Sequence, residues 1–215
     1  MKAALPVLLA VTQSAVYKMT PNRLGLVQVY TGEGKGKTSA SLGLSLRAIG
    51  QGFSTYVIQF MKSGDTGELF SVKKYIPNFK IAQFGKDALA DKQLKMFEFD
   101  GKGDLNGTDG RYVFLPDTAE KEPARRALEH ASNVIHSGKY DLVVLDEINC
   151  ALHKNLISIN EVIKLLNDKP EKVEVILTGR DAPQEIMDRA DYVSLIKEVK
   201  HPWHQGIGAR RGIEY

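Results

Sequence analysis

The chain has 215 residues, of which 43% are hydrophobic and 26% charged, and its formal net charge is +3. This length and composition are typical of one globular domain large enough to bury a full core. The net charge is too small to indicate a nucleic-acid partner or a membrane surface. No apolar stretch has the length of a membrane span, so we expect neither kind of partner.

The N-terminal segment raises the question of cellular location. Lys2 and the apolar residues Ala3–Val11 could be read as a short signal peptide, but Pro6 interrupts the run and no clean cleavage site follows. We expect an N-terminal arm over residues 1–24 instead, packed on the domain or on a partner subunit, and one α/β domain over residues 25–215. Cys150 is the only cysteine, which suits the reducing cytoplasm.

The first strong motif is the glycine-rich stretch Gly32–Thr38, which ends in Gly-Lys-Thr. It lies between the apolar run Leu26–Val29, expected to be a strand, and the helical stretch Ser39–Ile49. This context is the one that a phosphate-binding loop requires. Its backbone N–H groups would converge on phosphate oxygens, Lys37 would contribute charge, and the Thr38 hydroxyl would bind Mg²⁺. The alternative is a glycine-rich turn without a ligand, which the agreement of motif and context disfavours.

One feature of the loop departs from the standard pattern of a glycine, four residues and Gly-Lys-Thr. The position of the first glycine is occupied by Thr31, and Gly32 comes one place late. The sequence therefore predicts a tighter or differently wrapped loop. Phosphates could then be held in another register or direction than in ordinary phosphoryl-transfer enzymes.

Further apolar runs alternate with helical stretches along the rest of the chain. Continuous apolar runs suit parallel strands that are covered on both faces, and the alternation predicts a doubly wound α/β domain of the P-loop NTPase type, with a mainly parallel sheet and helices on both faces. The remaining strands are expected at Ser54–Phe60, Phe79–Phe84, Leu142–Leu145, Val173–Leu177 and Tyr192–Ile196, and the helices at Ala119–His136, Ile159–Leu166 and Gln184–Arg189.

Polar residues follow several of these strands, at the edge where such sheets bind ligands. Asp146 and Glu147 follow the strand Leu142–Leu145, and one or both could hold Mg²⁺ or serve as a base. The alternative is a pair that caps a helix. Lys62 and Arg180 are candidate phosphate partners at two other strand ends, although surface cations are common.

Two other stretches are less specific. His201-Pro202-Trp203-His204 lacks a third metal ligand nearby in sequence, so packing or substrate contact is the favoured interpretation. The glycine- and aspartate-rich segment Gly101–Gly110 does not match a calcium-binding loop and is interpreted as a surface loop or lid.

The chain resembles the ATP:corrinoid adenosyltransferases that carry a phosphate loop. The resemblance extends from about Gly25 to the C-terminus. The matching stretches are Gly32–Thr38, Leu46-Arg47-Ala48, Gln59-Phe60-Met61-Lys62, Leu145–Asn149, Leu177–Arg180 and the tail Lys200-His201-Pro202 to Ala209–Tyr215. The shifted loop and the Gly-Ile-Glu-Tyr ending are together more specific than either alone.

This resemblance implies transfer of the 5′-deoxyadenosyl group of ATP to Co(I) of a corrinoid, either cobalamin or cobinamide, with release of triphosphate. It also implies Mg²⁺, a homodimer whose N-terminal segments help to cover the corrinoid, and a flavoprotein reductant. Lys37, Thr38 and Glu147 are the candidates for catalysis, and Thr38, Asp146 and Glu147 for the metal. The candidates for ATP binding are Gly32, Glu33, Gly34, Lys35, Gly36, Lys37, Thr38, Ser39, Lys62 and Arg180.

The corrinoid side is not assigned by the sequence. A Phe-x-Trp segment of bacterial members is missing from residues 85–117, where the aromatic candidates are Phe97, Phe99, Tyr112 and Phe114. Two other functions stay open: an ATPase or kinase of conventional direction, disfavoured by the shifted glycine, and a nucleotide-dependent corrinoid-binding module. The reaction products would separate them.

Overall fold

The computed structural model describes residues 24–62, 64, 66–85 and 118–214. The expected N-terminal arm, apart from Leu24, lies outside the described residues. So do the segment Gly101–Gly110 and the four aromatic candidates for the corrinoid side. The division of the chain into an arm and a domain stays a prediction.

Six parallel strands form one sheet in the order β3-β2-β4-β5-β1-β6. Each predicted apolar run is a strand of this sheet, with ends that differ by at most two residues. Strands β1, β4 and β5 extend beyond their apolar runs to include a polar residue. The strands are β1 (Val27–Thr31), β2 (Thr55–Phe60), β3 (Phe79–Phe84), β4 (Leu142–Asp146), β5 (Glu174–Thr178) and β6 (Tyr192–Leu195).

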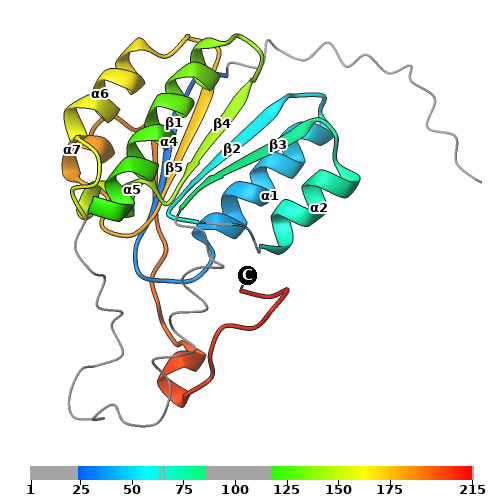
Figure 1. The fold of residues 1–215 in the computed structure, drawn as a ribbon, viewed down its shortest axis with the longest axis vertical. Helices are drawn as coiled ribbons and strands as arrows, with labels where there is room; N and C mark the ends of the chain where they lie inside the picture. The colour runs from blue at the N-terminus through cyan, green and yellow to red at the C-terminus, as the bar shows by residue number, and fades with distance from the viewer. Residues whose placement is uncertain (1–23, 63, 65, 86–117, 215) are drawn as a thin grey trace, which may run out of the picture.

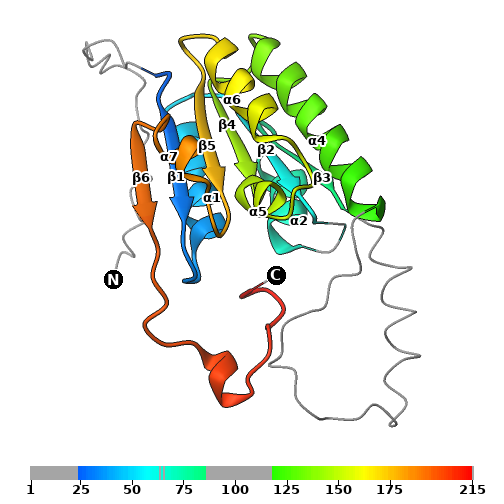
Figure 2. The same ribbon diagram turned by 90° about the vertical axis from the view of Figure 1, so that its left-hand side faces the viewer.

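Helices cover both faces of the sheet (Figures 1 and 2). Helices α1 (Lys37–Gly50) and α2 (Gly67–Tyr75) lie on one face. Helices α4 (Thr118–His136), α5 (Ile148–His153) and α6 (Ile159–Asp168) lie on the other, where α7 (Gln184–Met187) adds the buried side chain of Ile186. This arrangement confirms the predicted doubly wound α/β fold.

Two α-helices in the described part of the chain were not predicted. Helix α2 buries only Val72 and therefore shows no apolar periodicity in the sequence. Helix α5 has only 6 residues and begins immediately after Glu147, so it is too short to show a helical periodicity in the sequence. The helix expected at Gln184–Arg189 is shorter than predicted and ends at Met187.

The two faces of the sheet bury very different cores. The face under α4, α5 and α6 holds the larger hydrophobic cluster, and the face under α1 and α2 holds a small one. Helix α1 buries Ser41 and Ser45 against the sheet, whereas Leu46 is exposed. The two serine hydroxyls donate to backbone carbonyls of the same helix, so these small side chains lie inside without unpaired polar atoms.

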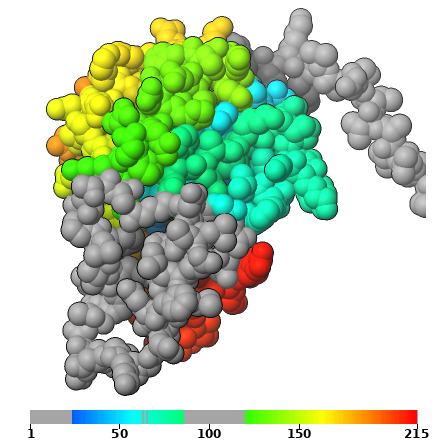
Figure 3. All heavy atoms as spheres, in the orientation of Figure 1, coloured from blue at the N-terminus to red at the C-terminus, as the bar shows by residue number. Residues whose placement is uncertain are grey.

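All six strands point their carboxyl ends toward one edge of the sheet, and the described part of the C-terminal tail passes below that edge (Figure 2). The tail contains a short 3-10 helix, η1 (Pro202–Gln205), and its last described residues return toward the sheet. The space-filling view also shows the described part of the C-terminal tail, in red, at the lower end of the molecule (Figure 3). The phosphate loop, Lys62, Asp146 and Arg180 are therefore all brought to one edge.

Candidate active site

The glycine-rich loop joins the end of β1 to the start of α1. Thr31, at the position of the first standard glycine, remains in β1, and its Oγ1 accepts a hydrogen bond from the Ala182 N–H at 3.2 Å. Gly32 then begins the turn with a φ of 103°, and a Cβ there would lie 2.5 Å from the carbonyl oxygen of Ile196. The shifted glycine thus follows from a strand that continues through Thr31.

The chain that follows β6 supports the loop from one side. The Gly34 N–H donates to the carbonyl oxygen of Ile196 at 2.8 Å. A Cβ on Gly34 would lie 2.6 Å from the carbonyl oxygen of Lys197. The shape of the loop therefore depends on a contact with a segment more than 160 residues away, which no local motif could have revealed.

Lys37 begins α1, and its side chain turns back into the loop. Its Nζ donates to the carbonyl oxygens of Gly32 at 2.5 Å and Gly34 at 2.8 Å. Burial lowers the pKa of the Lys37 ammonium, and the nearby Glu147 carboxylate partly opposes this shift. The lysine is thus a cation held against the inner wall of the loop.

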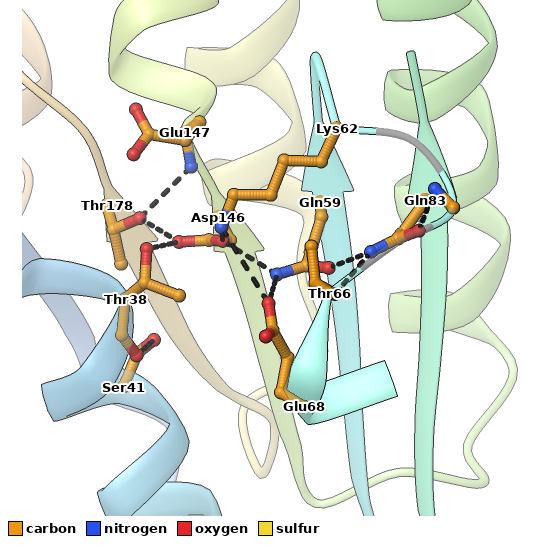
Figure 4. A network of polar contacts seen from close by, with 11 residues as sticks. Thr38, Ser41, Gln59, Lys62, Thr66, Glu68, Gln83, Asp146, Glu147 and Thr178 are labelled. Atoms are coloured by element: carbon orange, nitrogen blue, oxygen red, sulfur yellow. Dashed lines mark hydrogen bonds and ion pairs between the residues drawn. The ribbon is translucent and has the colours of Figure 1, made fainter. Parts of the chain in front are cut away.

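Asp146 is the centre of a polar network at the end of β4 (Figure 4). Its Oδ1 accepts hydrogen bonds from the hydroxyls of Thr38 at 2.8 Å and Thr178 at 2.6 Å. Its Oδ2 accepts from Lys62 Nζ at 2.7 Å and Gln59 Nε2 at 3.1 Å. Burial would raise the pKa of Asp146, but the Lys62 ammonium and the hydroxyl donors outweigh it and hold that pKa below its usual range.

Glu147 lies next to this network but points elsewhere. It adopts a left-handed backbone conformation with a φ of 66°, and its N–H donates to the Thr178 hydroxyl at 3.0 Å. This conformation turns the Glu147 side chain away from Asp146 (Figure 4) and toward the loop cavity. The Cys150 thiol donates to its carboxylate at 2.9 Å. Glu147 is also the residue before α5, but its side chain makes no capping hydrogen bond to that helix.

A cavity of about 250 Å³ opens over the loop. Arg180 reaches it from the end of β5, and its guanidinium lies 3.1 Å from the Glu33 carboxylate. Among the predicted residues, Gly32, Lys62 and Asp146 do not line the cavity. Those that do are Glu33, Gly34, Lys35, Gly36, Lys37, Thr38, Ser39, Glu147 and Arg180, and the tail adds His201, Ile213 and Glu214.

Ile213 and Glu214 were not predicted as site residues, although the tail was one of the matching stretches, and His201 was interpreted as making a packing or substrate contact. Their signal in the sequence was the unusual ending itself, which gave no chemical role for any one side chain. The Arg210 guanidinium and backbone N–H bind the Glu214 carboxylate and lower its pKa to about 2. The tail thus presents a paired carboxylate and an imidazole to the cavity.

The sequence model of the family described as "ATP:corrinoid adenosyltransferase BtuR/CobO/CobP" matches residues 23–215. The chain belongs to the ATP:corrinoid adenosyltransferase family. A corrinoid adenosyltransferase of a Sinorhizobium species is 34% identical over 193 residues, which cover 89% of this chain and 80% of the relative. The Escherichia coli corrinoid adenosyltransferase is 32% identical over 196 residues, covering 89% and 86%.

A third relative, the corrinoid adenosyltransferase CobA of Salmonella typhimurium, is 31% identical over 196 residues, covering 89% of this chain and 86% of the relative. Membership in the adenosyltransferase family confirms the resemblance and the enzyme class predicted from the sequence. None of the described helices is long and apolar enough to cross a bilayer.

A magnesium ion would find oxygen ligands at the adenosyltransferase cavity. The Thr38 hydroxyl donates a hydrogen bond to Asp146, so the lone pairs of Thr38 Oγ1 are available to a cation. The Glu147 carboxylate lines the same cavity. Asp146 is fully buried with four hydrogen bonds, so it fits behind these ligands better than among them. The described residues contain no group of three or more His, Cys, Asp or Glu that could hold a metal by themselves.

Proposed function

We propose that this enzyme transfers the 5′-deoxyadenosyl group of ATP to Co(I) of cobalamin or cobinamide and releases triphosphate. The observation that carries the proposal is the cavity over the loop, where Lys35, Lys37 and Arg180 face the space that a polyphosphate would fill. In this reaction the cobalt electron pair forms the bond to the ribose 5′-carbon. The carbon–oxygen bond breaks, and its electron pair leaves on triphosphate.

The protein's main task in such a reaction is to stabilise the charge of the leaving group. Preorganised donors act strongly where charge develops, because they need no rearrangement during the step. The N-terminus of α1 adds a favourable dipole at the same place. We assign Lys37, Lys35, Arg180 and the loop from Gly32 to Ser39 to phosphate binding. Lys37 would have to exchange its loop carbonyl partners for phosphate oxygens.

A magnesium ion is part of the proposal. We assign Thr38 and Glu147 as its protein ligands, with Asp146 orienting Thr38 from behind. When bound, the ion neutralises phosphate charge and fixes the triphosphate geometry. Small hard cations of this kind prefer a few protein oxygens together with phosphates and water, which fits a site with few carboxylates of its own.

The remaining assignments rest on the resemblance. We propose a cytoplasmic homodimer that receives its reduced corrinoid with the help of a flavoprotein. The corrinoid would lie at the carboxyl edge of the sheet, where such folds bind their ligands.

Product analysis tests the proposed activity. The enzyme is incubated with MgATP and chemically reduced cobinamide or cobalamin, and the nucleotide products are separated by anion-exchange chromatography. Equal amounts of triphosphate and of light-sensitive alkylated corrinoid are expected. ADP and phosphate would identify an ATPase or kinase of conventional direction, and the absence of turnover with tight nucleotide binding would identify a corrinoid-binding module.

A further inference from the structure

Lys62 lies beside the phosphate loop without lining its cavity. Its side chain runs from the carboxyl end of β2 toward Asp146 (Figure 4), and its Nζ lies 2.7 Å from Asp146 Oδ2. The Lys62 Nζ also lies 4.0 Å from Oε1 of Glu68. The sequence predicted Lys62 as a phosphate ligand, whereas its ammonium is directed at the buried acid.

The backbone of Lys62 is held in place by the end of the neighbouring strand. The N–H of Met61, which has a φ of 57°, donates to the carbonyl oxygen of Phe84 at 2.7 Å. A Cβ on Gly85 would lie 2.7 Å from the carbonyl carbon and oxygen of Lys62. A lysine fixed at both its backbone and its ammonium belongs to the architecture of the site.

Its partner Asp146 has no acceptor capacity left. Two hydroxyls occupy Oδ1, and an amide and the Lys62 ammonium occupy Oδ2. Gln59, the amide donor, also donates to Glu68 and accepts from Gln83, so its own orientation is fixed. The negative charge of Asp146 is therefore neutralised from within the protein.

We propose that Lys62 is a positioning residue that neutralises Asp146, so that the site does not bind a free divalent cation and receives its metal together with the nucleotide. This inference rests on the magnesium role assigned above. The carboxylates around the cavity have cationic neighbours within the protein: Asp146 pairs with Lys62, Glu33 with Arg180 and Glu214 with Arg210, and Glu147 interacts with the Lys37 ammonium. A metal ion entering alone finds no net attraction, whereas one that carries polyphosphate oxygens is drawn in by Lys37, Lys35 and Arg180.

Neutralising Asp146 also keeps the Thr38 hydroxyl in one orientation. An Asp146 carboxylate without Lys62 would itself attract the incoming cation and could exchange the Thr38 hydrogen bond for a metal bond. With Lys62 in place, the Thr38 hydroxyl donates a hydrogen bond to Asp146, and the lone pairs of its oxygen face the metal. Lys62 thereby acts on the metal through two other residues.

The test measures free Mn²⁺, as a probe for Mg²⁺, by its electron paramagnetic resonance signal with the full chain and no nucleotide. Wild type and Lys62→Arg should bind Mn²⁺ weakly and equally. Lys62→Met should bind it on the order of tenfold more tightly, because an unbalanced carboxylate then faces the site. Glu68→Gln, which removes a charge but keeps the lysine, should not bind it more tightly.

Asp146→Asn should bind free Mn²⁺ more weakly than wild type, and Lys62→Met/Asp146→Asn should return to the wild-type value. This second pair keeps the test decisive if Lys62→Met alone does not fold, because the double variant leaves no unpaired buried charge. Folding is checked by circular dichroism. The proposal is overturned if folded Lys62→Met binds Mn²⁺ no more tightly than wild type, or if the double variant binds it no more tightly than Asp146→Asn.

Failure of the wider magnesium assignment would look different. Turnover with ATP would then be unaffected by removal of divalent cations in wild type, whatever the ranking of the variants in the Mn²⁺ titration. The two results are read from separate experiments.

Discussion

The Thr38 hydroxyl donates a hydrogen bond of 2.8 Å to Asp146, although 108 positions separate the two residues in the chain. Thr38 lies in the first turn of α1, and Asp146 ends β4. Their hydrogen bond therefore ties the phosphate loop to the centre of the sheet. It also decides which face of the Thr38 oxygen is available to a cation.

The first prediction concerns the loop lysine. Lys37→Ala should lower kcat/KM for ATP by about a hundredfold to a thousandfold, the usual cost of removing one donor to developing charge. Lys35→Ala is the matched control, because Lys35 lines the same cavity but is exposed on the loop. It should cost much less. Near-normal turnover of folded Lys37→Ala would disprove the phosphate-loop assignment.

The second prediction separates the two acids. Glu147→Gln should raise the Mg²⁺ concentration needed for half-maximal turnover, because its carboxylate faces the cavity. Asp146→Asn should chiefly lower the free energy of unfolding, because it leaves the Lys62 ammonium without its buried partner, a loss of about 3 kcal/mol or more for such pairs. Mg²⁺ titrations of activity and urea melts of both variants check this. Unchanged magnesium activation in Glu147→Gln would remove Glu147 from the metal site.

The third prediction is the acid sensitivity of the fold. The pKa of Asp146 is lower in the folded protein than its ordinary value of 3.8, so the unfolded chain binds the proton first as the pH falls. Its stabilising contribution is complete above that ordinary value and is lost as the pH falls through the lower folded pKa. Between pH 5 and 2, wild-type stability should therefore fall more steeply than that of Asp146→Asn. Identical slopes in wild type and Asp146→Asn would contradict the prediction.

The fourth prediction uses the exposed pair over the cavity. Glu33 holds the Arg180 guanidinium at 3.1 Å, and both side chains are more than half exposed. Glu33→Gln should free Arg180 for phosphate and lower the KM for ATP roughly two- to fivefold, the range of an exposed ion pair. Arg180→Ala should raise the KM. A shift of both variants in the same direction would show that the pair does not compete with ATP.

The fifth prediction concerns the single thiol. Burial and the Glu147 carboxylate raise the pKa of Cys150 to about 12, so roughly one molecule in ten thousand carries a thiolate at pH 8. Cys150 in the folded protein should react with iodoacetamide far more slowly than in guanidinium, where mass spectrometry should find one rapid modification. Equal rates in the two conditions would mean that the thiol is not protected.

Much of this arrangement was predictable because parallel strands bring their carboxyl ends to one edge. The sequence predicts a strand before Asp146, before Arg180 and before the glycine loop that leads to Lys37. In each case polar residues follow the strand. The fold rule then placed those residues together. Neither the prediction of the strands nor the rule that places their carboxyl ends together requires knowledge of a single side-chain contact.

The partners of these residues were not predictable in the same way. Lys62 could equally have reached phosphate, and only the structure shows that it ends on Asp146. The direction of Glu147 follows from its left-handed backbone, which propensities do not predict for glutamate. His201 and Glu214 reach the cavity through the path of a tail that has no hydrophobic periodicity.

The small hydrophobic cluster under α1 and α2 has a consequence for the dynamics of the enzyme. Helix α1 follows the phosphate loop, and its fully buried side chains are Lys37, Ser41 and Ser45. Its apolar residues Leu42, Leu44, Ala48 and Ile49 are only partly buried against the sheet, so less apolar surface resists its local opening than in a helix with a fully buried apolar face. We expect the amide protons of α1 to exchange with deuterium faster than those of β4, and to slow when nucleotide binds. Nucleotide binding would then stabilise α1 against local opening. The exchange rate of its amide protons would therefore measure whether nucleotide is bound at the loop.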